Sequence, residues 1–169
     1  MGDSQSQNLW ILMTKALQFK AFSNKDLREL EKMIFALYRE DPCGEKISRR
    51  KIRDTVQELI RHPEKGTISI FRVGEAVVGY SIVITYWSNE FGGKIALIDE
   101  CYVKPSWRNQ GIGTSFIKYV SNAKAAGLKG IVAEVTPVNK HALAFYSRQG
   151  FAPAQNRYLF KRWVADKNA

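Results

Sequence analysis

The chain contains few of the residues that build metal sites and disulfide frameworks. Among its 169 residues there are two cysteines, Cys43 and Cys101, and two histidines, His62 and His141, with no Cys-x-x-Cys pair. This pattern indicates neither a zinc site nor a disulfide framework. It is typical of a protein that works in the reducing cytoplasm, and we expect no metal ion.

The sequence also lacks a long apolar run. The early apolar stretch, residues 9–13, follows no basic segment and precedes no small-residue cleavage pattern. It therefore predicts neither a membrane span nor a signal peptide, and we expect no membrane partner. A chain of this length builds one well-buried core. We expect a flexible polar tail over residues 1–8 and a single domain over residues 9–169.

Acidic residues are outnumbered by basic ones. The 26 Lys and Arg residues against 16 Asp and Glu residues give a formal charge of +10. Such an excess favours an anionic partner, which could be nucleic acid, an acidic membrane surface or a polyphosphate cofactor. The densest basic cluster, residues 46–53, has no interleaved aromatic side chains. That composition is typical of a solvated helix face and disfavours nucleic acid as a partner.

The remaining sequence alternates between strand and helix patterns. Periodicity and capping residues predict helices that end before Pro42 and Pro63, a helix from Ile112 and a short helix over residues 139–148. Strand patterns occupy residues 16–22, 67–72, 76–87, 94–103, 130–135 and 156–163. This order predicts an α/β (α+β) fold, in which one mixed sheet is flanked by helices.

A glycine-rich turn, residues 108–113, lies between a strand and a helix, an arrangement that commonly binds an anion. A phosphate-binding P-loop requires a lysine after the last glycine, where this chain has Thr114. A dinucleotide-binding turn requires a third glycine, where this chain has Phe116. Glu134, at roughly the spacing of a ribose-binding acid, is the one point in favour of that alternative.

What remains is the pattern Arg-x-x-Gly-x-Gly after an apolar strand, which resembles the acyl-coenzyme-A-binding turn of the GNAT acetyltransferases. The segment NKHALAFYSRQGF, residues 139–151, is similar to the second motif of that superfamily. The resemblance covers about residues 67–163 and is closest to polyamine- and histone-type members. It implies the GNAT fold, a mostly antiparallel mixed sheet of about six or seven strands with about four helices, and acetyl-CoA as co-substrate without a metal.

The resemblance also implies which residues bind acetyl-CoA. The backbone N–H groups of residues 110–113 form a concave nest at a helix start, and Arg108 adds a permanent cation. Asn139 and Tyr146 share one helical face, on which Asn139 would hold the pantetheine arm. The residues expected to bind the cofactor are Cys101, Tyr102, Val103, Arg108, Asn109, Gln110, Gly111, Ile112, Gly113, Thr114, Asn139 and Tyr146.

Acetyl transfer to an amine needs a base, a stabilised oxyanion and a proton for the departing thiolate. By resemblance, Tyr146 would protonate the sulfur, and Asp99 is the preferred base with Glu100 as the fallback. Strict alternation along the strand places Asp99 with Cys101 on one face and Glu100 with Ile98 on the other. Under that pattern, only one of the two acids can point into the site, unless a β-bulge interrupts the alternation.

The backbone N–H groups near Cys101 and Val103, where paired strands splay, would contact the thioester carbonyl and the pantetheine. The cysteine itself could suggest an acyl-cysteine intermediate. With no histidine nearby in sequence and a buried strand around it, Cys101 is better explained as a small core residue. We therefore expect direct attack in a ternary complex.

The expected function is transfer of an acetyl group to a primary amine of a small molecule or to a lysine side chain. The alternative is a non-catalytic acyl-CoA-sensing or nucleic-acid-binding module on the same fold. Acceptor specificity is expected in the first two helices and in the loop at residues 88–93, which carry no recognisable motif. The aromatic residues of the last expected strand are compatible with a homodimer.

Overall fold

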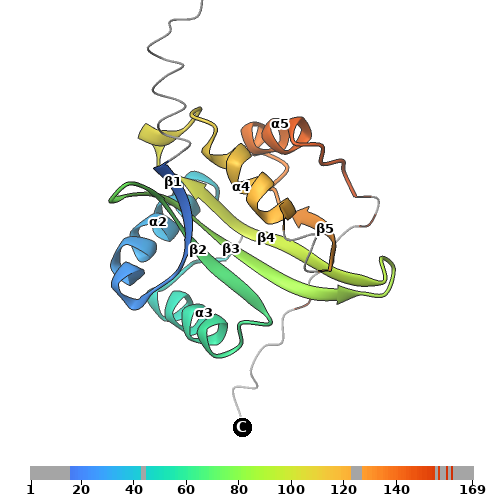
Figure 1. Cartoon of the computed structure of the whole chain (residues 1–169), viewed down its shortest axis with the longest axis horizontal. Coiled ribbons are helices and arrows are strands. Elements are labelled where there is room, and N and C mark those ends of the chain that lie inside the picture. The colour runs from blue at the N-terminus through green and yellow to red at the C-terminus, as the bar shows by residue number, and fades with distance from the viewer. Residues whose placement is uncertain are drawn as a thin grey trace, which may run out of the picture.

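The computed structural model describes residues 16–42, 45–122, 127–154, 156, 159 and 161. One sheet in the order β1-β2-β3-β4-β5 forms its centre, and helices cover both faces (Figure 1). The strands are β1 (Leu17–Ala21), β2 (Gly66–Val73), β3 (Ala76–Ser88), β4 (Gly93–Val103) and β5 (Leu128–Ala133). Adjacent strands are antiparallel except β4 and β5, which are parallel. The expected mixed, mostly antiparallel sheet is confirmed.

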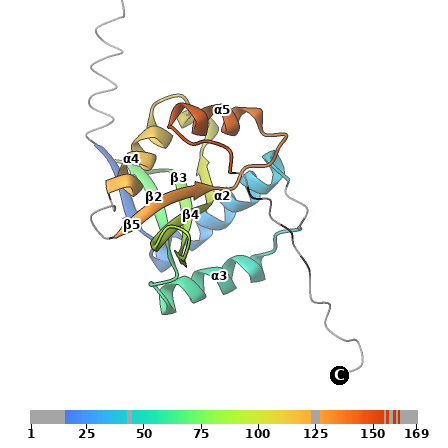
Figure 2. The ribbon, with the colours of Figure 1, turned by 90° about the vertical axis from the view of Figure 1, so that its right-hand side faces the viewer.

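The helices lie in two layers, one on each side of the sheet (Figure 2). The layer formed by α2 (Leu27–Glu40) and α3 (Arg49–Arg61) packs on one face, and α4 (Ile112–Asn122) and α5 (Lys140–Arg148) lie on the other. Two short 3₁₀ helices, η1 (Asn24–Asp26) and η2 (Pro105–Trp107), precede α2 and α4. The expected four helices are therefore present in the described part of the chain.

The described residues form five strands, fewer than the six or seven expected. The strand expected at residues 156–163 lies largely outside the described residues, and Asn156, Leu159 and Lys161 are not in a strand. The tail expected at residues 1–8 also lies outside them.

Local sequence explains how α2 begins. The backbone nitrogen and hydroxyl of Ser23 donate to the Asp26 carboxylate at 3.0 and 2.8 Å, which confirms the capping box that their spacing predicts. Arg72 of β2 donates to the other oxygen of Asp26 at 2.5 Å. Leu30 of α2 and Ile52 of α3 then bury their side chains against the sheet. The capped helix is thus fixed in register on the strands.

A β-bulge in β4 breaks the alternation that the sequence predicts. Ile82 of β3 pairs with Glu100, whereas the next residue, Val83, pairs with Ile98, so Asp99 is an extra residue without a partner in β3. As a result, Ile98 packs in the same apolar cluster as Cys101, on the α4–α5 side. The prediction that Ile98 and Cys101 lie on opposite faces is therefore wrong, because the bulge changes the phase of the strand.

The pairing of β4 with β5 ends where the bulge begins. The last paired residues are Ile98 and Ala133, while residues 99–103 of β4 continue beside β3 alone among the described strands. β5 ends at Ala133, so these residues have no strand on that side within the described ranges. The sheet is therefore open at the place where the sequence predicts that paired strands splay.

Candidate active site

A cleft of about 1,400 Å³ lies at this opening, bounded by the η2–α4 turn, α5 and the end of α2. It is larger than the roughly 300–1,000 Å³ that hold drug-sized ligands. The expected catalytic residues Asp99, Glu100 and Tyr146 all line it. All the expected cofactor-binding residues line it as well, except Gln110, whose side-chain amide donates to the Ser106 carbonyl at 3.0 Å.

The two glycines of the turn have different roles. Asn109 and Gly111 have positive φ angles of 60° and 74°, which curl the backbone ahead of α4 as a concave nest requires. Gly113 is needed for close packing instead, because a Cβ there would lie 3.0 Å from the ring of Phe145 in α5. One glycine shapes the turn, and the other allows α4 and α5 to approach each other.

Arg108 anchors the turn to two other elements. Its Nε donates to the Val103 carbonyl at 2.8 Å, and its Nη2 donates to the Glu40 carboxylate at 2.6 Å. The guanidinium also lies 5.3 Å from the centre of the Tyr102 ring, within the range of a cation–π contact. The cation expected to face a pyrophosphate is therefore paired with a carboxylate at the end of α2.

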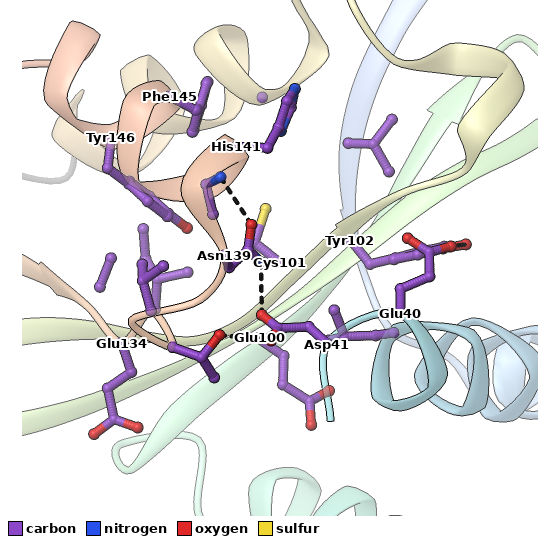
Figure 3. Close-up of a pocket in the computed structure, with 18 of the residues that line it drawn as sticks. Glu40, Asp41, Glu100, Cys101, Tyr102, Glu134, Asn139, His141, Phe145 and Tyr146 are labelled. Atoms are coloured by element: carbon purple, nitrogen blue, oxygen red, sulfur yellow. Dashed lines mark hydrogen bonds between the residues drawn. The ribbon is translucent and has the colours of Figure 1, made fainter. Parts of the chain in front are cut away.

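Asp41, the residue after α2, binds the second motif (Figure 3). Its two carboxylate oxygens accept hydrogen bonds from the Thr136 hydroxyl and the Asn139 amide, both at 2.6 Å. The amide oxygen of Asn139 accepts from the Ala142 backbone at 2.9 Å and so caps α5. Glu40 and Asp41 therefore connect α2 to both motifs.

Sequence reasoning missed Glu40 and Asp41. Their partners lie 68 and 98 positions away along the chain, so no local spacing marks the two residues as part of the site. Only the charge of two consecutive acids at a predicted helix end could have drawn attention to them.

Glu100 is held in place by tyrosine hydroxyls. Tyr80, which is fully buried, donates to Glu100 Oε2 at 2.7 Å, and Tyr38 also hydrogen-bonds to this carboxylate. Burial raises the pKa of Glu100, an effect that these hydrogen bonds partly oppose. In Figure 3 the Glu100 side chain projects from β4 toward α3. It therefore faces the side of the sheet opposite α5.

Asp99 differs from its neighbour. Its side chain keeps contact with solvent, yet the surrounding walls of the cleft raise the pKa of the carboxyl through partial burial. Within the described ranges, no hydrogen bond or ion pair engages this carboxylate. Both acids line the cleft, and the bulge breaks the strict alternation that the sequence predicts for them.

Tyr146 extends from α5 with its hydroxyl pointing into the cleft (Figure 3). Its ring packs edge-on against Phe145 and Phe151, each at 5.1 Å between centroids. Burial, with a smaller contribution from nearby Cys101, raises the pKa of Tyr146, so the phenol stays protonated. Burial also raises the pKa of Cys101 to about 12. A thiol with that pKa is a poor nucleophile, which supports a packing role for Cys101.

The basic cluster at residues 46–53 lies apart from the cleft and is rich in ion pairs. Arg49 and Arg53 both contact Glu31, at 3.6 and 3.2 Å, and Arg50 contacts Asp54 at 3.7 Å. The three arginine side chains are exposed. They form the solvated helix face that the sequence predicts.

In the described part of the chain, no helix is long and apolar enough to cross a membrane. Among the same residues, no group of three or more His, Cys, Asp or Glu side chains is arranged to hold a metal ion.

The fold and the cleft are of the GNAT type. Residues 25–151 match the sequence profile of the acetyltransferase (GNAT) family, and the chain belongs to this family. The dinucleotide-binding alternative that Glu134 left open is therefore set aside.

Curated relatives carry N-acetyltransferase names. The chain is 27% identical over 154 residues to an uncharacterised N-acetyltransferase of Methanocaldococcus jannaschii, covering 90% of this chain and 66% of the relative. It is 37% identical over 78 residues to the thialysine N-epsilon-acetyltransferase of Bos taurus, covering 46% of this chain and 45% of the relative. The chain thus spans less than two thirds of the length of these relatives.

Solved structures share the fold. A protein of Clostridium difficile 630, named as a possible acetyltransferase, has a TM-score of 0.77 at 20% identity, covering 89% of this chain and 99% of that one. An aminoglycoside acetyltransferase from an uncultured soil metagenomic sample, solved with sisomicin, has a TM-score of 0.66 at 16% identity, covering 91% and 99%. At these identities the likeness shows the fold alone.

Proposed function

We propose that the protein transfers the acetyl group of acetyl-CoA to a primary amine by direct attack in a ternary complex. The observation that carries this proposal is the bulge at Asp99. It brings two carboxylates and the end of β4 into the lining of one cleft, which Tyr146 also lines. A base and an acid that line the same cleft are what aminolysis of a thioester requires.

The residues of the cleft fit acetyl-CoA. The curled backbone at Asn109 and Gly111 precedes the positive end of α4, a combination that suits phosphate groups. Lys140 and Arg148 of α5 add positive charge to the same side of the cleft. When bound, acetyl-CoA supplies the acetyl thioester. Asn139 would hold the pantetheine arm with the amide hydrogen that Asp41 leaves available.

Each proton in the transfer has a proposed carrier. Asp99, directly or through water, takes one proton of the acceptor ammonium, and the neutral nitrogen then bonds to the acetyl carbon as the carbon–sulfur bond breaks. Tyr146 gives its phenolic proton to the leaving sulfur, and the second proton of the attacking nitrogen passes, through water, to the Tyr146 phenolate and restores the phenol. Glu100, held by Tyr80, adds negative charge beside the acceptor. Backbone N–H groups near Cys101 and Val103 are proposed to stabilise the carbonyl oxygen, since β4 is unpaired on its β5 side there.

The test is thiol release from acetyl-CoA with a panel of primary amines and lysine peptides. Tyr146→Phe should lower kcat by roughly 100-fold or more, the usual contribution of a general acid. Its dissociation constant for acetyl-CoA by calorimetry should stay within about twofold of wild type. Acetyl-CoA binding without thiol release from any acceptor would instead favour the non-catalytic acyl-CoA-sensing module. Absence of acetyl-CoA binding would refute both.

A further inference from the structure

A second, smaller cavity lies between α2, α3 and the bulge of β4. Its volume is about 100 Å³, and its walls are aliphatic: Ile34, Ile47, Ile52, Val56 and Ile82. The hydroxyl of Thr55, the polar side chain that α3 contributes to the wall, donates to the Lys51 carbonyl at 3.0 Å. The part of the wall formed by α3 is therefore mainly apolar.

The small cavity and the main cleft share three lining residues. Tyr38, Asp99 and Glu100 line both. The bulge produces this arrangement, because it places two consecutive carboxylates at the junction of the two spaces. The part of a ligand that occupies the small cavity would be apolar. The chemical group that follows it, at the junction of the two spaces, would face the carboxylates of Asp99 and Glu100.

We propose that this cavity binds the alkyl portion of the acceptor, so that the substrate is a small primary amine on an unbranched chain of about four carbons. The inference rests on the proposed function and names its substrate class. A primary ammonium at the junction is paired by the acids, while its methylene groups contact the aliphatic walls. The chain length follows from the ratio of the volumes. A cavity of about 150 Å³ holds the six carbons of benzene, so one of about 100 Å³ holds about four carbons.

The small volume of the cavity separates the two acceptor classes that the proposed function leaves open. A lysine side chain of a protein carries its amine at the far end of the alkyl chain, with a polypeptide behind it. With the amine at the junction and the methylene groups in a space of about 100 Å³, no room is left for that polypeptide. A free alkylamine has no polypeptide to accommodate.

The experiment measures kcat/KM by thiol release for straight-chain amines from ethylamine to octylamine, at saturating acetyl-CoA. Each methylene buried should raise kcat/KM about fourfold, from about 0.8 kcal/mol per methylene, up to about four carbons. Longer chains should gain nothing or lose activity. Branched isomers of butylamine should be poorer substrates than n-butylamine.

Variants of the cavity wall test its location. Val56→Phe, at a buried wall position, should move the optimum to shorter chains, and Val56→Ala should move it to longer ones. Ile60→Phe is the matched control, since Ile60 lies on the same helix but is 55% exposed and lines neither cavity. Its chain-length profile and the acetyl-CoA affinity of all folded variants should equal those of wild type. If Val56→Phe does not fold, Val56→Ala alone carries the test.

Three results would overturn the inference. They are thiol release that does not depend on chain length, a profile that the Val56 variants leave unchanged, and lysine peptides that exceed n-butylamine in kcat/KM. Each of these keeps the acetyltransferase activity and removes only the alkyl site. No thiol release with any acceptor would refute the proposed function and the inference together.

Discussion

Replacing Asp41 with alanine tests whether the end of α2 holds the second motif in place. The change removes the acceptor of two side-chain hydrogen bonds, from Thr136 and Asn139, each 2.6 Å long. Hydrogen bonds to a charged group contribute about 1.5–3 kcal/mol each, and partial solvent exposure reduces that value. We expect a loss of roughly 2 kcal/mol in unfolding free energy, or about 4–8 °C in Tm for a chain of this size.

The cap of α5 should survive, because Asn139 still accepts from the Ala142 backbone. The variant should therefore fold, while the freed Asn139 side chain lowers the affinity for acetyl-CoA about tenfold, or roughly 1.4 kcal/mol. Thermal unfolding and titration calorimetry measure the two effects. Asp54→Ala is the control, since this exposed carboxylate pairs with Arg50, at 3.7 Å, outside the cleft. Wild-type acetyl-CoA affinity in Asp41→Ala would refute the reasoning.

Three further predictions concern the bulge, the turn and the buried tyrosine. In Asp99→Asn, kcat/KM should fall, and its pH–rate profile should lose the acidic limb. In wild type this limb lies above the ordinary aspartate pKa, because burial raises the pKa of Asp99 and the base must be deprotonated. Gly113→Ala should cost about 1–2 kcal/mol in urea unfolding, since its Cβ meets the Phe145 ring at 3.0 Å, and Phe145→Leu should restore part of the loss. Tyr80→Phe removes a hydrogen bond that lowers the pKa of Glu100. The variant should therefore lose about 1–2 kcal/mol of unfolding free energy at pH 8, and this loss should shrink as the pH falls and Glu100 is protonated. A loss that is the same at pH 4 and pH 8 would contradict this role.

Much of the fold follows from short-range patterns. The capping box at Ser23 and Asp26 and the turn at residues 108–113 were both recognisable before the structure, because each depends on residues within a few positions of one another. The apolar spacing of the helices predicts which faces are buried for the same reason. The family resemblance adds the GNAT fold, and the sequence match over residues 25–151 supports it.

The bulge in β4 could not be predicted from the strand itself. Residues 94–103 read as regular alternation, and an extra residue appears only when the strand is aligned with β3. The mistaken placement of Ile98 relative to Cys101 follows from this, since a single unpaired residue reverses the phase of all that come after it.

The sequence by itself thus determined the class of protein, the glycine-rich turn before α4 and the contacts between residues a few positions apart. Only the tertiary structure decided that Asp99 and Glu100 share a cleft, that Arg108 is paired with Glu40, and that Asp41 holds Asn139. The physical reason is the range of the interactions. Helix caps and turns depend on neighbouring residues, whereas strand register and the partner of a charged side chain depend on contacts between segments far apart in the chain.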